Sequence, residues 1–144
     1  MKFIKTTAAI LIATGVATMA QHINSTQVPA AVKASFEKAY PGVKTVKWEK
    51  EKGDFEAGFK QRANEMSAVF KADGKQTESE MEIKTAALPA GIVTYVKQNY
   101  KGAAIKEAAK ITKTTTGEVN YEAEVKGKDL LFDSTGKFIK VAQD

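Results

Sequence analysis

The chain has 144 residues, no cysteine and a formal net charge of +5 at pH 7. Without cysteine no disulfide can stabilise a small fold, so the fold must be held by its core alone. The basic excess is mild, and lysines alternate with glutamates instead of gathering in a basic stripe, which argues against a nucleic-acid-binding protein.

The first twenty residues have the pattern of a secretory signal peptide. Lys2 and Lys5 precede an apolar run over residues 8–13, and small residues follow up to Ala20. The run falls short of the roughly 20 apolar residues that a membrane span needs. We therefore expect a soluble periplasmic or secreted chain that begins near Gln21, with a net charge of +3 once the two lysines are removed and no stable membrane insertion.

Two amphipathic helices are predicted, because apolar residues recur every fourth position in two stretches. Proline stands near the start of each stretch, and glycine follows each end at Gly42 and Gly102, as expected for helix termini. The two stripes are Val28, Val32, Phe36 and Tyr40, and then Leu88, Ile92, Val96 and Tyr100.

After each helix the period changes to two, which is typical of half-buried strands. In "DFEAGFK" the residues Phe55, Ala57 and Phe59 point to one face, and in "VNYEAEVK" every second residue from Val119 to Val125 does the same. Each strand is followed by another strand, by a glycine-containing turn ("ADGK" or "STGK") and by a last strand.

The unit is thus one helix and about four antiparallel strands, used twice. A unit of about 60 residues buries too little surface to be stable alone, so two units should share one core. We predict an α+β fold with a shared antiparallel sheet and both helices on one face. After the signal peptide (1–20), residues 21–144 would form a single domain of two repeats, about 28–84 and 88–144.

The repeats differ in two places that bear on function. Trp48 stands where the second repeat has Ala108, and it is either a core residue that shares strand parity with Val46 or a binding anchor. The hairpin "KQRANEM" also looks longer than "KGK", and extra residues at a hairpin tip either serve contact or are simply tolerated there.

Several stretches resemble a known family. The segments "VPAAV", "FEKAYPGVKTVKWEK", "FEAGFK" and "VFKADGK", followed by "LPAGIVTYVKQNYKG" and "YEAEVKGKDLLFDSTGK", are similar to the exported PepSY-like, beta-lactamase-inhibitor-like domains of bacteria. The resemblance implies the tandem fold and an envelope location. A fold-level likeness supplies no site.

Catalytic chemistry and metal binding are not expected. The one histidine, His22, lies in the predicted N-terminal tail, and the chain has no cysteine, so the usual pairs of nucleophile and base are missing from the folded part. Paired glutamates remain conceivable as catalysts, but they alternate with lysines on strand faces expected to be exposed, so we expect no enzyme and no cofactor. The turns at Asp73 and Asp133 lack the several oxygen ligands of a calcium loop. The strand "ESEME" is expected to present its glutamates on a solvated face.

The most suitable surface for a partner is the charged, helix-free face of the predicted sheet. We expect a non-enzymatic module that binds or inhibits another exported protein through this face; the alternative is a carrier or sensor of a small ligand held between sheet and helices. The candidate residues are Glu56, Lys60, Arg62, Glu122, Glu124 and Lys126.

Overall fold

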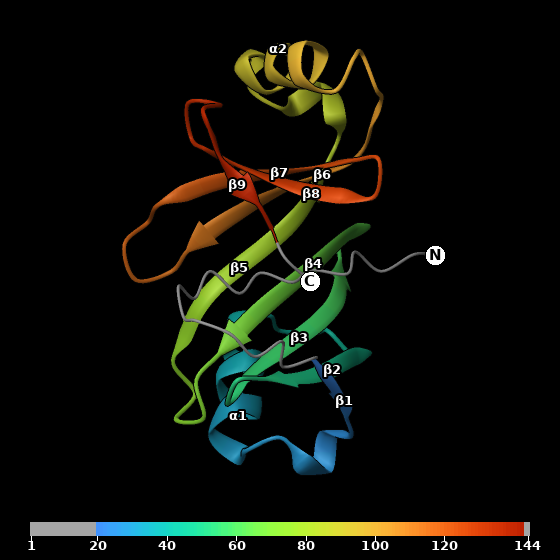
Figure 1. Cartoon of the computed structure of the whole chain (residues 1–144). Coiled ribbons are helices and arrows are strands. Elements are labelled where there is room, and N and C mark those ends of the chain that lie inside the picture. The colour runs from blue at the N-terminus through green and yellow to red at the C-terminus, as the bar shows by residue number, and fades with distance from the viewer. Residues whose placement is uncertain (1–19, 143–144) are drawn as a thin grey trace. The chain divides into compact units, whose positions relative to one another are not determined.

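The computed structural model describes residues 20–142, and the predicted signal peptide lies outside them except for Ala20 (Figure 1). Two α-helices, two short 3-10 helices (Ser25–Gln27 and Thr85–Ala87) and nine strands occur among these residues, and the strands form an antiparallel sheet in chain order, from β1 to β9. The predicted α+β class, with one helix and about four antiparallel strands in each repeat, is confirmed. The chain divides into two compact units at Ser79 and Glu80, within β5, and each unit is described separately.

The first unit contains one more strand than the sequence suggests. The segment Gln21–Ile23, expected to be part of a tail, forms a strand that pairs antiparallel with the next one, and Ile23 is buried in the core. The elements are β1 (Gln21–Ile23), α1 (Ala30–Ala39), β2 (Val46–Glu51), β3 (Asp54–Gln61), β4 (Asn64–Phe70) and β5 (Gln76–Ile83).

Helix α1 buries the predicted apolar stripe. Val32 and Phe36 are fully buried, and Phe36 lies at the centre of a group of aromatic rings. Its ring centroid is 5.0 Å from that of Phe59, 5.5 Å from that of Trp48 and 6.3 Å from that of Phe70. Edge-to-face pairs of this kind add to the free energy gained by burial alone.

Trp48 is a core residue. Only 5% of its surface is exposed, and it belongs to the same buried cluster as Phe36 and Phe55. The prediction from its strand parity with Val46 is therefore confirmed, and the alternative of a binding anchor is wrong.

The second unit repeats this arrangement. Helix α2 buries Ile92 and Val96 against a cluster that contains Leu130 and Phe132. Tyr95 stacks on Phe138, with ring centroids 4.6 Å apart. The elements are α2 (Ala90–Asn99), β6 (Ile105–Lys113), β7 (Val119–Val125), β8 (Lys128–Asp133) and β9 (Phe138–Val141).

In each unit a glycine lets the last turn approach the helix closely. Gly74 and Gly136 both have a φ of +90°. A Cβ atom on Gly74 would lie 2.6 Å from the carbonyl oxygen of Ala31, and one on Gly136 would lie 3.2 Å from Cβ of Pro89. Glycine is therefore required in "DGK" and "TGK" for two reasons: the turn needs a positive φ, and the helix leaves little room for a Cβ atom.

Candidate functional site

The hairpin between β3 and β4 contains two of the predicted binding residues, Lys60 and Arg62. Its turn consists only of Arg62 and Ala63, because Gln61 still pairs with Asn64. Both turn residues have a positive φ, 50° and 68°, as in the two-residue turns that match the twist of a hairpin. Lys60 forms a cross-strand ion pair with Glu65, with 3.1 Å between Nζ and Oε1.

The matching hairpin of the second unit has the same length. Val125 pairs with Lys128, so the turn is Lys126 and Gly127, with φ values of 53° and 72°. The prediction of a longer first hairpin is therefore wrong. The additional residues lengthen the strands, because β3 and β4 continue up to the turn itself.

Arg62 is the cation at the tip of the first hairpin. It is exposed, and no ion pair involves it among residues 20–142. Glycine tolerates a positive φ without strain, whereas another residue there costs about 1–2 kcal/mol. The first unit nevertheless has two non-glycine residues in its turn, whereas the second unit has one.

Glu56 is not on the solvated face that its strand parity suggested. The side chain is half-buried, it accepts a hydrogen bond from Ser67, and desolvation raises the pKa of its carboxyl group from 4.5 to about 7. Glu49, directly opposite on β2, raises the pKa of Glu56 further, because two carboxylates repel each other. The prediction of an exposed surface charge is wrong at this position, since strand parity identifies a face but not how closely that face is packed.

Glu122, the equivalent residue of the second unit, is only 5% exposed. Its cross-strand neighbours are Ala109 on β6 and Leu131 on β8, both buried and apolar. Glu124 is half-buried and faces Asp129, whereas Lys126 is exposed at the turn. The prediction that Glu122 projects from a solvated face is thus wrong too, and reversing its charge would bury an ammonium group beside Ala109 and Leu131.

The strand "ESEME" also differs from its prediction. Glu78 and Glu80 are 4% and 2% exposed, so this part of β5 is not a solvated face. His22 likewise lies in β1, with its Nδ1 atom 3.6 Å from Oε1 of Glu49. Among residues 20–142, His, Asp and Glu side chains nowhere form a group of three or more that could hold a metal ion.

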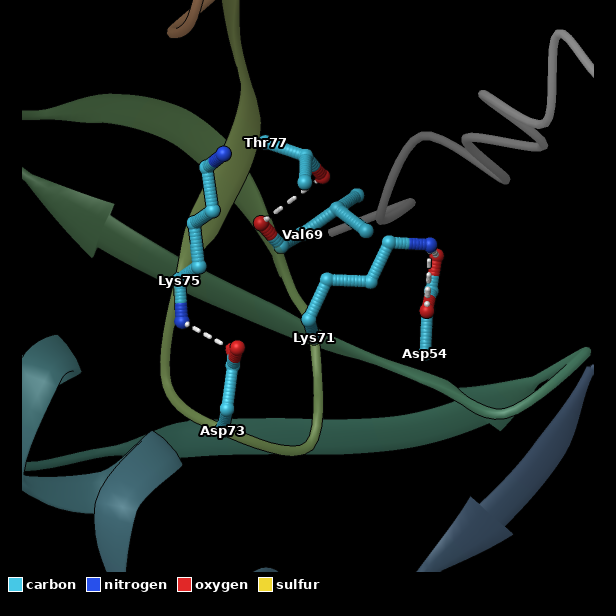
Figure 2. A network of polar contacts seen from close by, with 6 residues as sticks. All are labelled: Asp54, Val69, Lys71, Asp73, Lys75 and Thr77. Atoms are coloured by element: carbon cyan, nitrogen blue, oxygen red, sulfur yellow. Dashed lines mark hydrogen bonds and ion pairs between the residues drawn. The ribbon is translucent and has the colours of Figure 1, made fainter.

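The aspartates of the two glycine-containing turns act as predicted for turn residues. Asp73 accepts a hydrogen bond from the backbone N–H of Lys75, and Lys71 reaches Asp54 at 2.8 Å (Figure 2). Asp133 accepts from Thr135 and from the backbone N–H of Lys137, and these hydrogen bonds lower the pKa of its carboxyl group. The carboxylates therefore organise the turns.

The model of a family described as beta-lactamase-inhibitor-like, PepSY-like matches twice, over residues 15–77 and 59–140. None of the curated proteins matches. Within the described part of the chain, no helix is both long and apolar enough to cross a bilayer.

Solved structures of low sequence identity share the fold. A Bacteroides eggerthii protein described as periplasmic is 14% identical, with 80% of this chain and 88% of that chain covered and a TM-score of 0.67. A DUF2874 family protein from Bacteroides uniformis is 18% identical, with 79% and 88% covered and a TM-score of 0.66. A BLIP-like protein from Bacteroides fragilis is 21% identical, with 79% and 85% covered and a TM-score of 0.63. At these identities the likeness concerns the fold alone.

Proposed function

The chain belongs to the beta-lactamase-inhibitor-like, PepSY-like family, and from this we propose that it is a non-enzymatic, periplasmic or secreted module that binds another exported protein. The contact is made by the β3–β4 hairpin, where Arg62 binds an acidic group of the partner. The periplasmic description of a structural neighbour agrees with this location.

The observation that carries the proposal is the position of Arg62. It lies at the tip of a two-residue turn, whereas its neighbour Lys60 is already paired with Glu65. A guanidinium group can bind a carboxylate with two parallel hydrogen bonds, and arginine is enriched among residues that dominate binding energies. A turn that is already ordered also lowers the entropic cost of binding.

The backbone of the hairpin supports the same reading. Glycine would be the least strained residue at both turn positions, yet Arg62 and Ala63 occupy them. The φ of Arg62 is also found at Lys52 and Lys126, so the unusual residue is Ala63, which stands where the second unit has Gly127. Strained residues persist where the surrounding structure or a function requires them, so Ala63 indicates a constraint on this turn.

The alternative, a carrier of a small ligand between sheet and helix, is less well supported. The space between α1 and its strands is filled by the rings of Phe36, Tyr40, Phe59 and Phe70, with centroid separations of 4.5–6.3 Å. In the second unit the rings of Tyr95, Phe132 and Phe138 pack in the same way. A ligand would have to displace these contacts.

The test is a capture experiment from an envelope extract of the native host. The purified exported protein is immobilised as wild type, Arg62→Ala, Arg62→Lys or Lys126→Ala, and the retained proteins are identified by mass spectrometry. A specific partner should be retained by the wild type and by Lys126→Ala, the matched change in the other hairpin, and lost with Arg62→Ala. Arg62→Lys should retain it weakly, because an ammonium group cannot form the two parallel hydrogen bonds.

Two results would contradict the proposal. Retention of the same partner by wild type and Arg62→Ala would mean that the hairpin is not the contact. Failure to retain any protein specifically, also after chemical crosslinking, would argue against the binding function itself.

A further inference from the structure

We propose that the outer edge of β9 is a second interaction surface, independent of Arg62, and that it takes up an extended segment of a partner protein in which apolar and acidic residues alternate. Such a segment would add a strand to the sheet, with backbone hydrogen bonds providing affinity and side chains providing specificity.

The exposed apolar side chains identify this edge. Among the residues that the structure describes, Ile139 and Val141 are the only large hydrophobic residues classed as exposed, at 47% and 38%. Both lie in β9, which is only four residues long. Single exposed apolar residues are common on protein surfaces, but two such residues on one short strand form a patch that a partner can cover.

The backbone of the same strand has hydrogen-bonding groups on its outer edge that no strand among residues 20–142 pairs with. Within residues 20–142, β9 stands at the end of the strand order, and β8 is its only hydrogen-bonded neighbour. The N–H of Ala142 points inward, because it donates to the carbonyl oxygen of Asp129 at 2.7 Å. Successive residues of a strand point their backbone groups to opposite sides, so the N–H and C=O of Val141 point outward.

The side chain of Phe138 anchors β9 to α2 and β8, and this holds the strand in an extended form. Phe138 stacks on Tyr95 and lies 5.7 Å from Phe132, measured between ring centroids. Proteins protect open edges with lysines and β-bulges, and β9 has both, at Lys140 and opposite Leu131 and Phe132. Exposed isoleucine and valine do not prevent another strand from pairing with the edge. Their presence therefore distinguishes β9 from an edge strand that is only protected against such pairing.

The charge of the strand favours an acidic occupant. The segment from Lys137 to Ala142 contains two lysines and no acidic residue. Lys137 lies near Asp133, whereas Lys140 is in no ion pair among the described residues. A second copy of β9 would bring like charges together across the new strand pair, which is destabilising, whereas glutamates on a partner segment would pair with the lysines.

The probe is a fluorescent peptide of four Val-Glu repeats, and a peptide of four Val-Lys repeats is its control. Binding to the purified exported protein is measured by fluorescence anisotropy. We expect the acidic peptide to bind at least about tenfold more tightly than the basic one. Hydrogen exchange at the Val141 amide should slow in the complex, because that N–H becomes hydrogen-bonded.

Two variants of one residue test the backbone contact. Val141→Pro removes the outward N–H without touching the bonds to β8, and it should weaken binding about tenfold. Val141→Thr keeps the N–H and the branched shape, and it should change the affinity by less than about threefold. Lys140→Glu provides a charge test that does not depend on how well Val141→Pro folds, since it should reverse the preference between the two peptides.

Three results would overturn the proposal. One is an acidic peptide that fails to bind at millimolar concentration, and another is a Lys140→Glu variant with an unchanged peptide preference. The third is concentration-dependent dimerisation in sedimentation that Val141→Pro abolishes, which would make a second copy of the chain the occupant of the edge.

Discussion

Replacing Glu56 by glutamine should stabilise the protein at neutral and alkaline pH and leave its stability unchanged at acidic pH. Glutamine has nearly the shape of the protonated carboxyl group and can still accept the hydrogen bond from Ser67. It carries no charge, so it escapes both the desolvation of the carboxylate and the repulsion from Glu49 across the strand pair.

The magnitude follows from the pKa of this carboxyl group, which is 4.5 in its ordinary state and about 7 in the fold. A raised pKa means that the folded state holds the proton more tightly than the unfolded chain. As the pH rises from 4.5 to about 7, the unfolded chain loses the proton first, so the wild type loses stability over that window and not beyond it. At about 1.4 kcal/mol for each pH unit, the loss is roughly 3 kcal/mol.

The assay is urea unfolding of wild type and Glu56→Gln at intervals between about pH 4 and pH 9, followed by the fluorescence of Trp48, the only tryptophan of the chain. The two proteins should agree near pH 4, and the variant should be more stable by up to about 3 kcal/mol at pH 8. Glu37→Gln, a change at an exposed site of α1, serves as the control and should differ little from the wild type. A difference between Glu56→Gln and wild type that is the same at pH 4.5 and pH 8 would refute the reasoning.

Two other predictions use the repeat as an internal control, and urea unfolding measures both. Phe36→Ala should lower the free energy of unfolding by about 3–5 kcal/mol. Val96→Ala, at the equivalent helix position, should lower it by noticeably less, because truncating valine leaves a smaller cavity than truncating phenylalanine. An unchanged urea midpoint for Phe36→Ala would contradict the place of Phe36 in the core. Ala63→Gly should raise the free energy of unfolding by about 0.5–1 kcal/mol, because glycine tolerates the φ of 68° without strain. The opposite change at the matching turn position, Gly127→Ala, should lower it by a similar amount, and equal signs for the two variants would show that the turn backbone does not decide their stability.

The four-residue recurrence of apolar residues predicted the helices, and the alternation of side chains along the strands predicted which face of the sheet packs in the core. Both patterns depend on residues close in sequence. The stripe through Val32 and Phe36 and its repeat through Ile92 and Val96 are buried as expected, and the parity of Trp48 with Val46 gave the correct face. Burial on the opposite face depends on distant strands, so the alternation around Glu122 could not show that Ala109 and Leu131 would enclose it.

The other differences have local causes. The β3–β4 turn was expected to be longer because the segment "KQRANEM" has more residues than "KGK", and a left-handed alanine at position 63 has no sequence signal. Strand β1 is three residues long, too short for any periodicity, so nothing in the sequence indicated that His22 would pair with Glu49. The exposed edge at Ile139 and Val141 was missed because an apolar alternating strand is expected to be covered.

The close contact between Gly74 and Ala31 has a consequence for the order of folding. In each unit the start of the helix packs against a turn that follows roughly forty residues later in the chain, because Gly136 approaches Pro89 as Gly74 approaches Ala31. Contacts between residues far apart in sequence form slowly, because the entropy of the intervening chain must be lost first. As the chain is synthesised from its N-terminus, α1 can therefore reach its final packing only after the β4–β5 turn has been made. A substitution at Gly74 should then act mainly on the step in which the helix docks, and leave the earlier pairing of β2 with β3 largely intact.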